Sequence, residues 1–489
     1  MYGRNSSGLR AVSCVFVLML AAGCGGGGMG GYATDNSMSM SMTMSTSMDM
    51  GDMPQPSVMF SSPAQATTIH LGQAITLAWT SNNASSCSAS ASSDIGGSFS
   101  GSQDTRGSVT VAPMGTGTVT YMLSCMGPGG SAAANSATLT VLPSILSMLS
   151  PATITTIGST IDPIGKDNNP YGLAIAPVTA GLVTAGDLIA CNFSDGAGTE
   201  GNGTTLIGLH PSPGSTPYRI AQSASLQGCN ALAILPDGSI SAAARAANQN
   251  PLVAPSGAVG TPFSTDTFGG PWGEAYVPAS GQRPAALYVS NVNGTIDRIT
   301  LSGDAQTGFT QIVQGFCGSG KPGSIYAPAG LTYDPAVDTL YVVDSSSFSV
   351  IALARVSSIG TSGVTVAGQC GSTASAPTPM PTFTGPSAST ATVIAHGAPL
   401  FAPLSAALLA DGDLIVENSD IGLPSGQTPN LAVEVSPALP GGFVGRPLQL
   451  DTSGTSGALF GIVATVDGQG NQIVYFNDDN TNSVMRITQ

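Results

Sequence analysis

Residues 328–344 read PAGLTYDPAVDTLYVVD, and this stretch carries the pattern that decides the fold. A lead containing proline and glycine is followed by a short turn and by an apolar strand that ends in Asp344. Variants of the unit recur six times after residue 148, with starts near Pro170, Asn230, Pro271, Pro328, Pro403 and Gly461. Strands that repeat in this way, without helical stretches between them, are typical of a β-propeller. We therefore predict an all-β protein with a six-bladed propeller over residues 148–489.

The unit resembles the NHL repeat, whose consensus runs through G-L-A, D, L-Y-V-A-D and a closing R-V or R-I. Residues 287–299 and 339–351 match it best, whereas the second unit is weakest because Ala244 replaces the Asp or Asn. The sixth unit ends at Ile487 without an outermost strand. We expect residues 154–157 to supply that strand and close the ring, because closure removes free sheet edges.

The interval between the fourth and fifth units is long and rich in Ser, Thr and Pro. Residues 371–399 are therefore expected to form a loop, with His396 on the surface.

Residues 57–145 are expected to form a small β-sandwich, because apolar residues alternate along several short runs separated by Gly and Ser. The runs around Trp79 and Tyr121 resemble Ig-like modules of bacterial surface proteins. The order differs from antibody domains, since Trp79 precedes the first cysteine. Cys125 lies on an apolar strand face and Cys87 is the other cysteine of this segment, so we predict a Cys87–Cys125 disulfide. A spacer or stalk is the simplest function for such a module.

The first 24 residues indicate export. Two arginines precede an apolar stretch from Ala11 to Ala22, too short to span a bilayer, and Cys24 follows shortly after it. This order resembles the lipobox of bacterial lipoproteins, which implies that residues 1–23 are a signal peptide and that Cys24 carries lipid. Gly25 in place of Asp implies the outer membrane or cell surface. An ordinary secretory signal is the alternative.

Residues 24–56 are expected to be a tether rich in Met, Ser and Gly, with too few branched apolar residues for a packed core. Its methionines are either part of a plain spacer or soft ligands for Cu(I).

Cys14 lies in the leader and Cys24 is expected to carry lipid, which leaves six cysteines. An even number suggests three disulfides in an oxidising compartment. The six cysteines are Cys87, Cys125, Cys191, Cys229, Cys317 and Cys370. Their positions in successive repeats predict that Cys191 pairs with Cys229 and Cys317 with Cys370, each pair joining neighbouring blades.

The repeat places a polar residue at the same strand end in five units. These candidate channel-mouth residues are Asn192, Asn291, Asp344, Asn418 and Asp478, with Glu417 beside Asn418. Converging oxygens could hold Ca²⁺, and the fold resembles gluconolactonase-type propellers, which implies metal-dependent hydrolysis. Alternatively, each residue only caps its own turn. A hydrolase also needs a base, and only Glu274 and Glu417 lie on repeat strands or their leads.

The net charge of the chain excludes some classes of binding partner. The chain has 12 Lys and Arg against 27 Asp and Glu, a net charge of −15 that disfavours nucleic acid and anionic lipid surfaces. Membrane attachment is therefore expected through the lipid anchor. We expect a binding or scaffolding module for a protein, peptide or glycan, rather than an enzyme, and no cofactor apart from a conceivable Ca²⁺. A metal-dependent hydrolase or lyase is the alternative.

Overall fold

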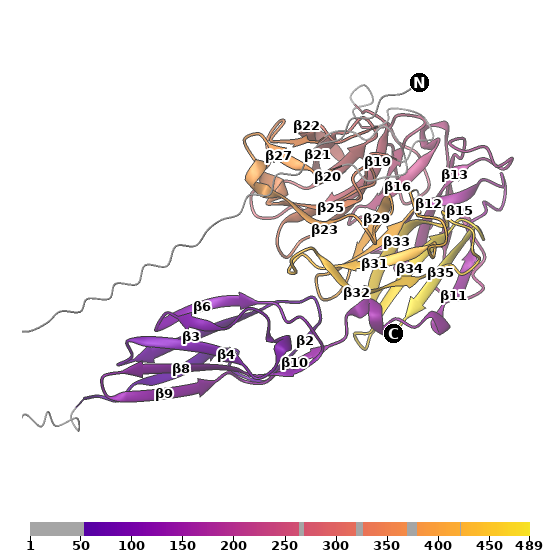
Figure 1. Cartoon of the computed structure of the whole chain (residues 1–489). Helices are drawn as coiled ribbons and strands as arrows, with labels where there is room; N and C mark the ends of the chain where they lie inside the picture. Colours follow the sequence, from indigo (N-terminus) through magenta and orange to yellow (C-terminus); the bar gives the residue numbers. More distant parts are fainter. Residues whose placement is uncertain (1–52, 264–267, 319–325, 369–378, 421) are drawn as a thin grey trace, which may run out of the picture. The chain divides into compact units, whose positions relative to one another are not determined.

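A computed structural model describes residues 53–263, 268–318, 326–368, 379–420 and 422–489 (Figure 1). The signal peptide, Cys24, nearly all of the methionine-rich tether and Cys370 lie outside these residues. None of the helices in the described ranges is long and apolar enough to cross a bilayer.

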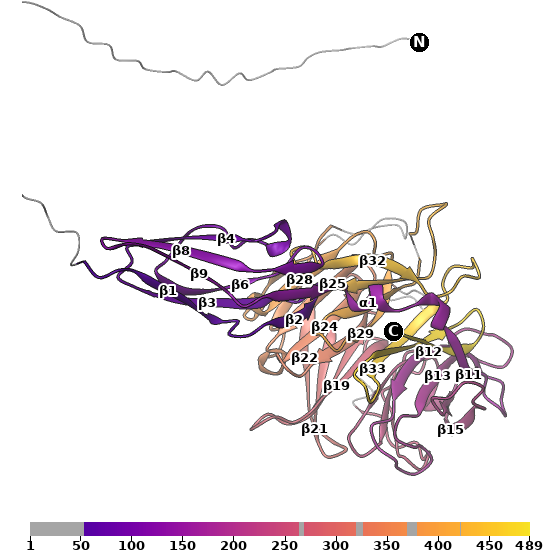
Figure 2. The same ribbon diagram turned by 90° about the horizontal axis from the view of Figure 1, so that it is seen from below.

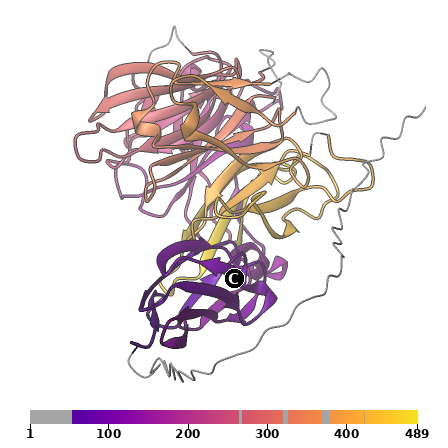
Figure 3. The same cartoon turned by 60° about the vertical axis from the view of Figure 1, so that its left-hand side comes forward.

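Residues 57–142 form a small all-β body that shares no strand with the sheets that follow (Figure 3). One sheet has the order β1-β3-β6, with bounds Ser57–Ser62, Ile75–Asn82 and Arg106–Val111. A second has the order β2-β10-β7, with bounds Thr67–His70, Leu139–Leu142 and Gly117–Val119. The third has the order β5-β4-β8-β9, with bounds Gly101–Gln103, Ser86–Ala91, Tyr121–Gly127 and Gly130–Asn135.

The core of this body confirms the alternation seen in the sequence. Leu77, Trp79 and Tyr121 are buried, and the Phe99 ring packs edge-on against Trp79 and Tyr121 at centroid distances of 5.5 and 5.7 Å. The Cys87–Cys125 disulfide is present, as predicted. It joins residues directly opposite each other on β4 and β8, within one sheet, whereas the antibody-domain bridge joins two sheets.

A short connection leads to the second body. Helix α1 (Ile145–Met148) packs against β32 and is labelled beside it in Figure 2.

The second body contains six sheets, which we name after their first strand in the list below. The β12 sheet holds β12 to β15: Asn168–Ile175, Leu188–Ser194, Thr205–Leu209 and Tyr218–Gln222. The β16 sheet holds β16 to β18: Cys229–Ile234, Ile240–Ala244 and Leu252–Val253. The β19 sheet holds β19 to β22, β26 and β27: Pro271–Val277, Ala286–Asn291, Ile296–Ser302, Ala305–Gln314, Val364–Ala367 and Thr382–Thr384.

The other three sheets follow the same plan. The β23 sheet holds β23, β24, β25 and β28: Pro328–Asp334, Thr339–Asp344, Ser349–Ala354 and Ala391–His396. The β29 sheet holds β29 to β32: Pro403–Leu408, Leu414–Asn418, Leu431–Val435 and Phe443–Gln449. The β33 sheet holds β33, β34, β35 and β11: Leu459–Val466, Gln472–Asp478, Ser483–Thr488 and Thr155–Ser159.

The first strands of these sheets surround a common axis. β12 contacts β16, β16 contacts β19, and so on through β23, β29 and β33, which contacts β12 again (Figure 1). This closed cycle of sheets makes the second body a β-propeller.

The glycine of the repeat explains how the inner strands approach so closely. A Cβ on Gly172 would lie 3.0 Å from the Ala231 Cα of the next inner strand, and one on Gly330 would lie 2.7 Å from the Leu404 carbonyl oxygen. Both separations are tighter than ordinary contacts, so the position favours a residue without a side chain.

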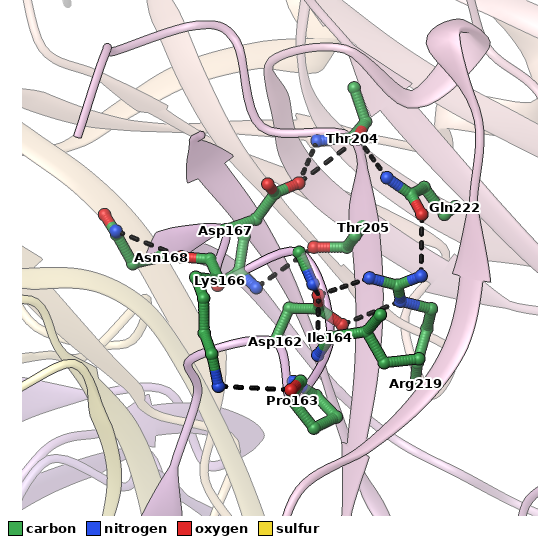
Figure 4. Close-up of polar contacts among 12 residues, drawn as sticks. Asp162, Pro163, Ile164, Lys166, Asp167, Asn168, Thr204, Thr205, Arg219 and Gln222 are labelled. Atoms are coloured by element: carbon green, nitrogen blue, oxygen red, sulfur yellow. Dashed lines mark hydrogen bonds and ion pairs between the residues drawn. The ribbon is translucent and has the colours of Figure 1, made fainter. Parts of the chain in front are cut away.

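The ring closes as predicted, because β11 pairs antiparallel with the C-terminal strand β35. The loop after β11 is fixed to the outer strand of the β12 sheet (Figure 4). There the Arg219 guanidinium faces the Asp162 carboxylate, with Nε 2.8 Å from Oδ1. Asp167 accepts hydrogen bonds from the Thr204 amide and hydroxyl. This seam loop, residues 160–167, therefore joins the last sheet to the first.

The predicted loop at 371–399 is wrong where the chain forms two strands, β27 at Thr382–Thr384 and β28. Residues 391–396 form β28, which pairs with β25 as the outer strand of the β23 sheet, and His396 lies half-buried within it. The β-branched residues from Thr392 to Ile394 favour a strand. The prediction of a loop relied instead on the many Ser, Thr and Pro residues around them. Strand β26 instead pairs in parallel with β22 and extends the preceding sheet.

Candidate functional site

The candidate channel-mouth residues lie at or near the end of the second strand of five propeller sheets, and none of them is more than 3% exposed. Asp344 accepts a hydrogen bond from the Ser346 amide at 3.1 Å, and Asp478 accepts one from the Thr481 amide at 3.2 Å. These are bonds to the turn that follows each strand.

The three asparagines also have hydrogen-bond partners within the protein. Asn291 donates to Asp297 Oδ2 at 2.8 Å, and Asn418 donates to the Pro399 carbonyl at 2.9 Å. Asn192 donates to the carbonyl of Thr160 in the seam loop at 3.0 Å. In the described part of the chain, no hydrogen bond joins one of these five residues to another. The hydrogen bonds of these residues stabilise nearby turns and loops.

The residue just before this position fastens neighbouring sheets. Cys191 forms the predicted disulfide with Cys229, the first residue of β16. The Ser290 hydroxyl donates to the Ala329 carbonyl on β23 at 2.5 Å, and Asn477 donates to the Tyr171 carbonyl on β12 at 3.1 Å. Each bond reaches the inner strand of the next sheet, so this repeat position stabilises the ring.

For the predicted Cys317–Cys370 disulfide, only Cys317 lies among the described residues. Cys317 is disulfide-bonded, while Cys370 lies outside the described residues.

A cavity of about 440 Å³ occupies the channel, and all six inner strands line it. Aromatic side chains from different sheets line part of it and pack together. The Tyr171 ring is stacked between Phe193 and Phe460, with centroids 4.3 and 4.0 Å away. Trp272 is 4% exposed and packs in the same apolar cluster, and the Arg245 guanidinium lies 4.7 Å from the centre of its ring.

Asn230 interrupts this apolar ring. The equivalent position of the other units holds Tyr171, Trp272, Ala329, Leu404 or Phe460. Asn230 is 6% exposed and lines the cavity, and neither its amide nitrogen nor its amide oxygen has a hydrogen-bond partner in the structure. A buried amide without partners costs about 1–3 kcal/mol, so a residue of this kind needs an explanation.

Two hydroxyl groups, those of Thr332 and Ser405, belong to residues that line the cavity. Thr332 donates to the Ala406 carbonyl at 2.6 Å, and Ser405 donates to Glu417 Oε2 at 2.6 Å. Their oxygens keep free lone pairs, while the Asn230 side chain offers both a donor and an acceptor.

The two glutamates that the sequence singled out are buried and uncharged at neutral pH. Burial raises the pKa of Glu274 to about 8, although Ser241 and Asn250 hydrogen-bond to its carboxyl group and oppose this shift. Burial likewise raises the pKa of Glu417 to about 8, against the hydrogen bond from Ser405. Both groups are therefore carboxylic acids in which one oxygen accepts hydrogen bonds, while the other, Glu274 Oε2 or Glu417 Oε1, is buried without a partner.

Asn230 was missed because the sequence reasoning followed the Asp or Asn after the second strand. A usable signal was present one strand earlier. Among six aligned leads, the position before the glycine is polar only at Asn230.

Comparison with known proteins finds matches only at low similarity. No protein-family model matches the chain, and no curated protein matches it. Among solved structures, virginiamycin B lyase from Staphylococcus aureus is 13% identical, with a TM-score of 0.40, covering 69% of this chain and 99% of the lyase. A gluconolactonase from Xanthomonas campestris is 12% identical, with a TM-score of 0.40, covering 66% of this chain and 87% of that enzyme.

A quinoprotein alcohol dehydrogenase-like protein from Bacteroides thetaiotaomicron is 9% identical, with a TM-score of 0.29, covering 89% of this chain and 93% of that protein. Similarity at this level carries no inference about activity or ligand.

Proposed function

We propose that this chain is a lipid-anchored protein of the cell envelope whose propeller binds an uncharged glycan or peptide group in its channel. The propeller consists of six NHL-like blades, and the Ig-like module of residues 57–145 serves as a spacer. The observation that carries the binding proposal is Asn230, a buried amide with unsatisfied hydrogen-bonding groups at the edge of a cavity.

The chemistry of the cavity favours an uncharged ligand. Its lining contains no Lys, Arg, His or Asp, and its one carboxyl group, Glu274, is neutral at pH 7 because burial raises its pKa to about 8. Apolar and aromatic surface with a few placed polar groups is typical of sites for small ligands. Sugars and peptide groups present donors and acceptors side by side, which matches an asparagine amide.

Asn230→Leu tests this proposal. Leucine completes the apolar ring, so we expect the variant to be as stable as the wild type or more stable. Binding should weaken at least tenfold, because the amide hydrogen bonds with the ligand are lost. The measurement is direct binding of neutral oligosaccharide and neutral peptide arrays to both proteins, followed by titration of the best binder and thermal melting.

Asn471→Ala is the matched control, since Asn471 lies in an exposed turn and bonds to Asp467. Equal affinity of the Asn230→Leu variant and the wild type, or no binder in either array, would contradict the proposal.

The proposed location of the protein is inferred from its first 24 residues. We expect Cys24 to carry lipid, so the wild type should incorporate an alkyne-tagged fatty acid and fractionate with outer membranes, whereas Cys24→Ser should do neither. Cys14→Ser is the control, because Cys14 belongs to the leader that is removed. Label that persists in Cys24→Ser would refute the anchor.

A further inference from the structure

Three carboxyl groups meet in the β29 sheet, away from the channel-mouth residues. Asp411 lies in the turn before β30, Asp413 immediately precedes that strand, and Glu434 lies on the neighbouring strand β31 opposite Ile415. One oxygen from each lies within 4.8 Å of the others. We call these residues the β30 acidic cluster. It is the one such group of His, Cys, Asp or Glu side chains in the described ranges.

The cluster contains buried oxygens that the protein does not satisfy. Asp413 is 2% exposed, and its Oδ2 has no hydrogen-bond partner. The Oδ2 atom of Asp411 is also buried without a partner, while its Oδ1 accepts the Asp413 amide at 3.1 Å. A buried carboxyl oxygen without a partner is costly, so these two atoms indicate a missing ligand.

Glu434 links the cluster to the helix that precedes the propeller. Its two oxygens accept the backbone amides of Ile145 at 3.2 Å and Leu146 at 2.8 Å, in the first turn of α1. Each oxygen keeps a second lone pair for another partner. A cation held here would therefore also fix the carboxylate that positions α1.

Burial is the main cause of the raised pKa values in this cluster. Burial, and then the neighbouring Asp411, raise the pKa of Asp413 to about 8, although Ser436 opposes this. Burial also raises the pKa of Glu434 to about 7. A divalent cation would offset the repulsion and the desolvation cost of the charged forms, and its binding would release the protons that burial retains.

We propose that Asp411, Asp413 and Glu434 bind one Ca²⁺ ion. Oxygen ligands from several carboxylates are those that Ca²⁺ prefers, and its flexible coordination suits a cluster completed by water and backbone carbonyls. The site is distinct from the channel-mouth positions considered from the sequence, since Asp413 precedes β30 and Asn418 ends it. It is also independent of ligand binding in the channel.

Calorimetric titration of the chelator-treated protein with CaCl₂ up to 10 mM tests the site, together with thermal melting in CaCl₂ and in EDTA. We expect saturable Ca²⁺ binding and a melting temperature several degrees higher in Ca²⁺. Asp413→Asn should weaken Ca²⁺ binding at least tenfold and remove the rise. It should still fold, because asparagine has the same shape and relieves the repulsion.

Asp467→Asn is the matched control, since Asp467 occupies an exposed turn outside the cluster. The proposal is overturned by the absence of Ca²⁺ binding in the wild type, or by equal Ca²⁺ affinity in wild type and Asp413→Asn.

Discussion

Replacing Asp162 with alanine is expected to lower the free energy of unfolding by about 3–5 kcal/mol, the cost typical of breaking a buried ion pair. The Asp162 side chain is 0% exposed and that of Arg219 is 18% exposed, so the substitution leaves a largely buried guanidinium without its carboxylate. It also removes the acceptor for the Ile164 and Gly165 amides in the seam loop. Equilibrium denaturation of both proteins at pH 7 measures the loss.

The position of this pair makes the effect large. The seam loop connects β11, the strand that completes the last sheet, to β12, the first inner strand. Arg219→Ala should therefore have a similar effect. Arg283→Ala is the control, because the Arg283–Asp338 pair has side-chain exposures of 47% and 16% and should contribute less than about 1 kcal/mol. If Asp162→Ala lowers the free energy of unfolding as little as Arg283→Ala does, the seam loop does not depend on the Asp162–Arg219 pair.

The same contribution should disappear in acid. Burial alone would raise the pKa of Asp162, but Arg219 and the backbone amides of Gly165 and Ile164 hold it below its ordinary value of about 3.8. A carboxyl group with a lowered pKa stabilises the folded state above the ordinary value, and this stability is lost as the pH falls toward the lowered value. The difference between wild type and Asp162→Ala should thus shrink below about pH 3.8.

The sequence predicted the propeller because its signals are periodic. Each lead and its following strand become the first two strands of a sheet, and the strand missing after Ile487 pointed to residues 154–157, where β11 is found. The positions of the cysteines within the repeat were equally informative, since Cys191 and Cys229 occupy related positions in successive repeats and form a disulfide.

The failures arise where the repeat is interrupted. Strand β28 contains Val393 and Ile394, but it follows a long insertion and pairs with β25 across more than thirty-five residues of chain. No local pattern specifies that pairing, because strand partners depend on packing between distant segments. The insertion itself supplies β26 and β27 to the β19 sheet.

The site shows the same distinction between local and distant information. Asp344 and Asp478 are conspicuous in the repeat because the turns after their strands use them. Asn230 and the β30 acidic cluster depend on what other sheets or strands place beside them. Nothing near Glu434 in the sequence indicates that Asp411 and Asp413 will lie next to it.

Gly273→Ala is the second substitution expected to have a large effect, a loss of about 3 kcal/mol in the free energy of unfolding. A methyl group there would overlap the Ala329 carbonyl oxygen on the next inner strand and would lie 2.9 Å from the Ser290 hydroxyl oxygen. That hydroxyl donates to the Ala329 carbonyl and accepts the Gly273 amide, so the new methyl would disrupt a bridge between sheets. Thermal melting and denaturant unfolding measure the loss.

Gly308→Ala separates this steric effect from the general effect of replacing a strand glycine. Gly308 lies within β22, and a Cβ there would meet only Thr300 atoms at 3.5 Å, an ordinary contact. We expect that variant to change stability by less than about 1 kcal/mol, with a gain from the less flexible unfolded chain. Neither glycine requires a left-handed backbone, so any difference between the variants reflects the space around each Cα. Equal stability of the two variants would mean that contact between inner strands does not determine the repeat glycine, and that the ring can widen to accept a side chain.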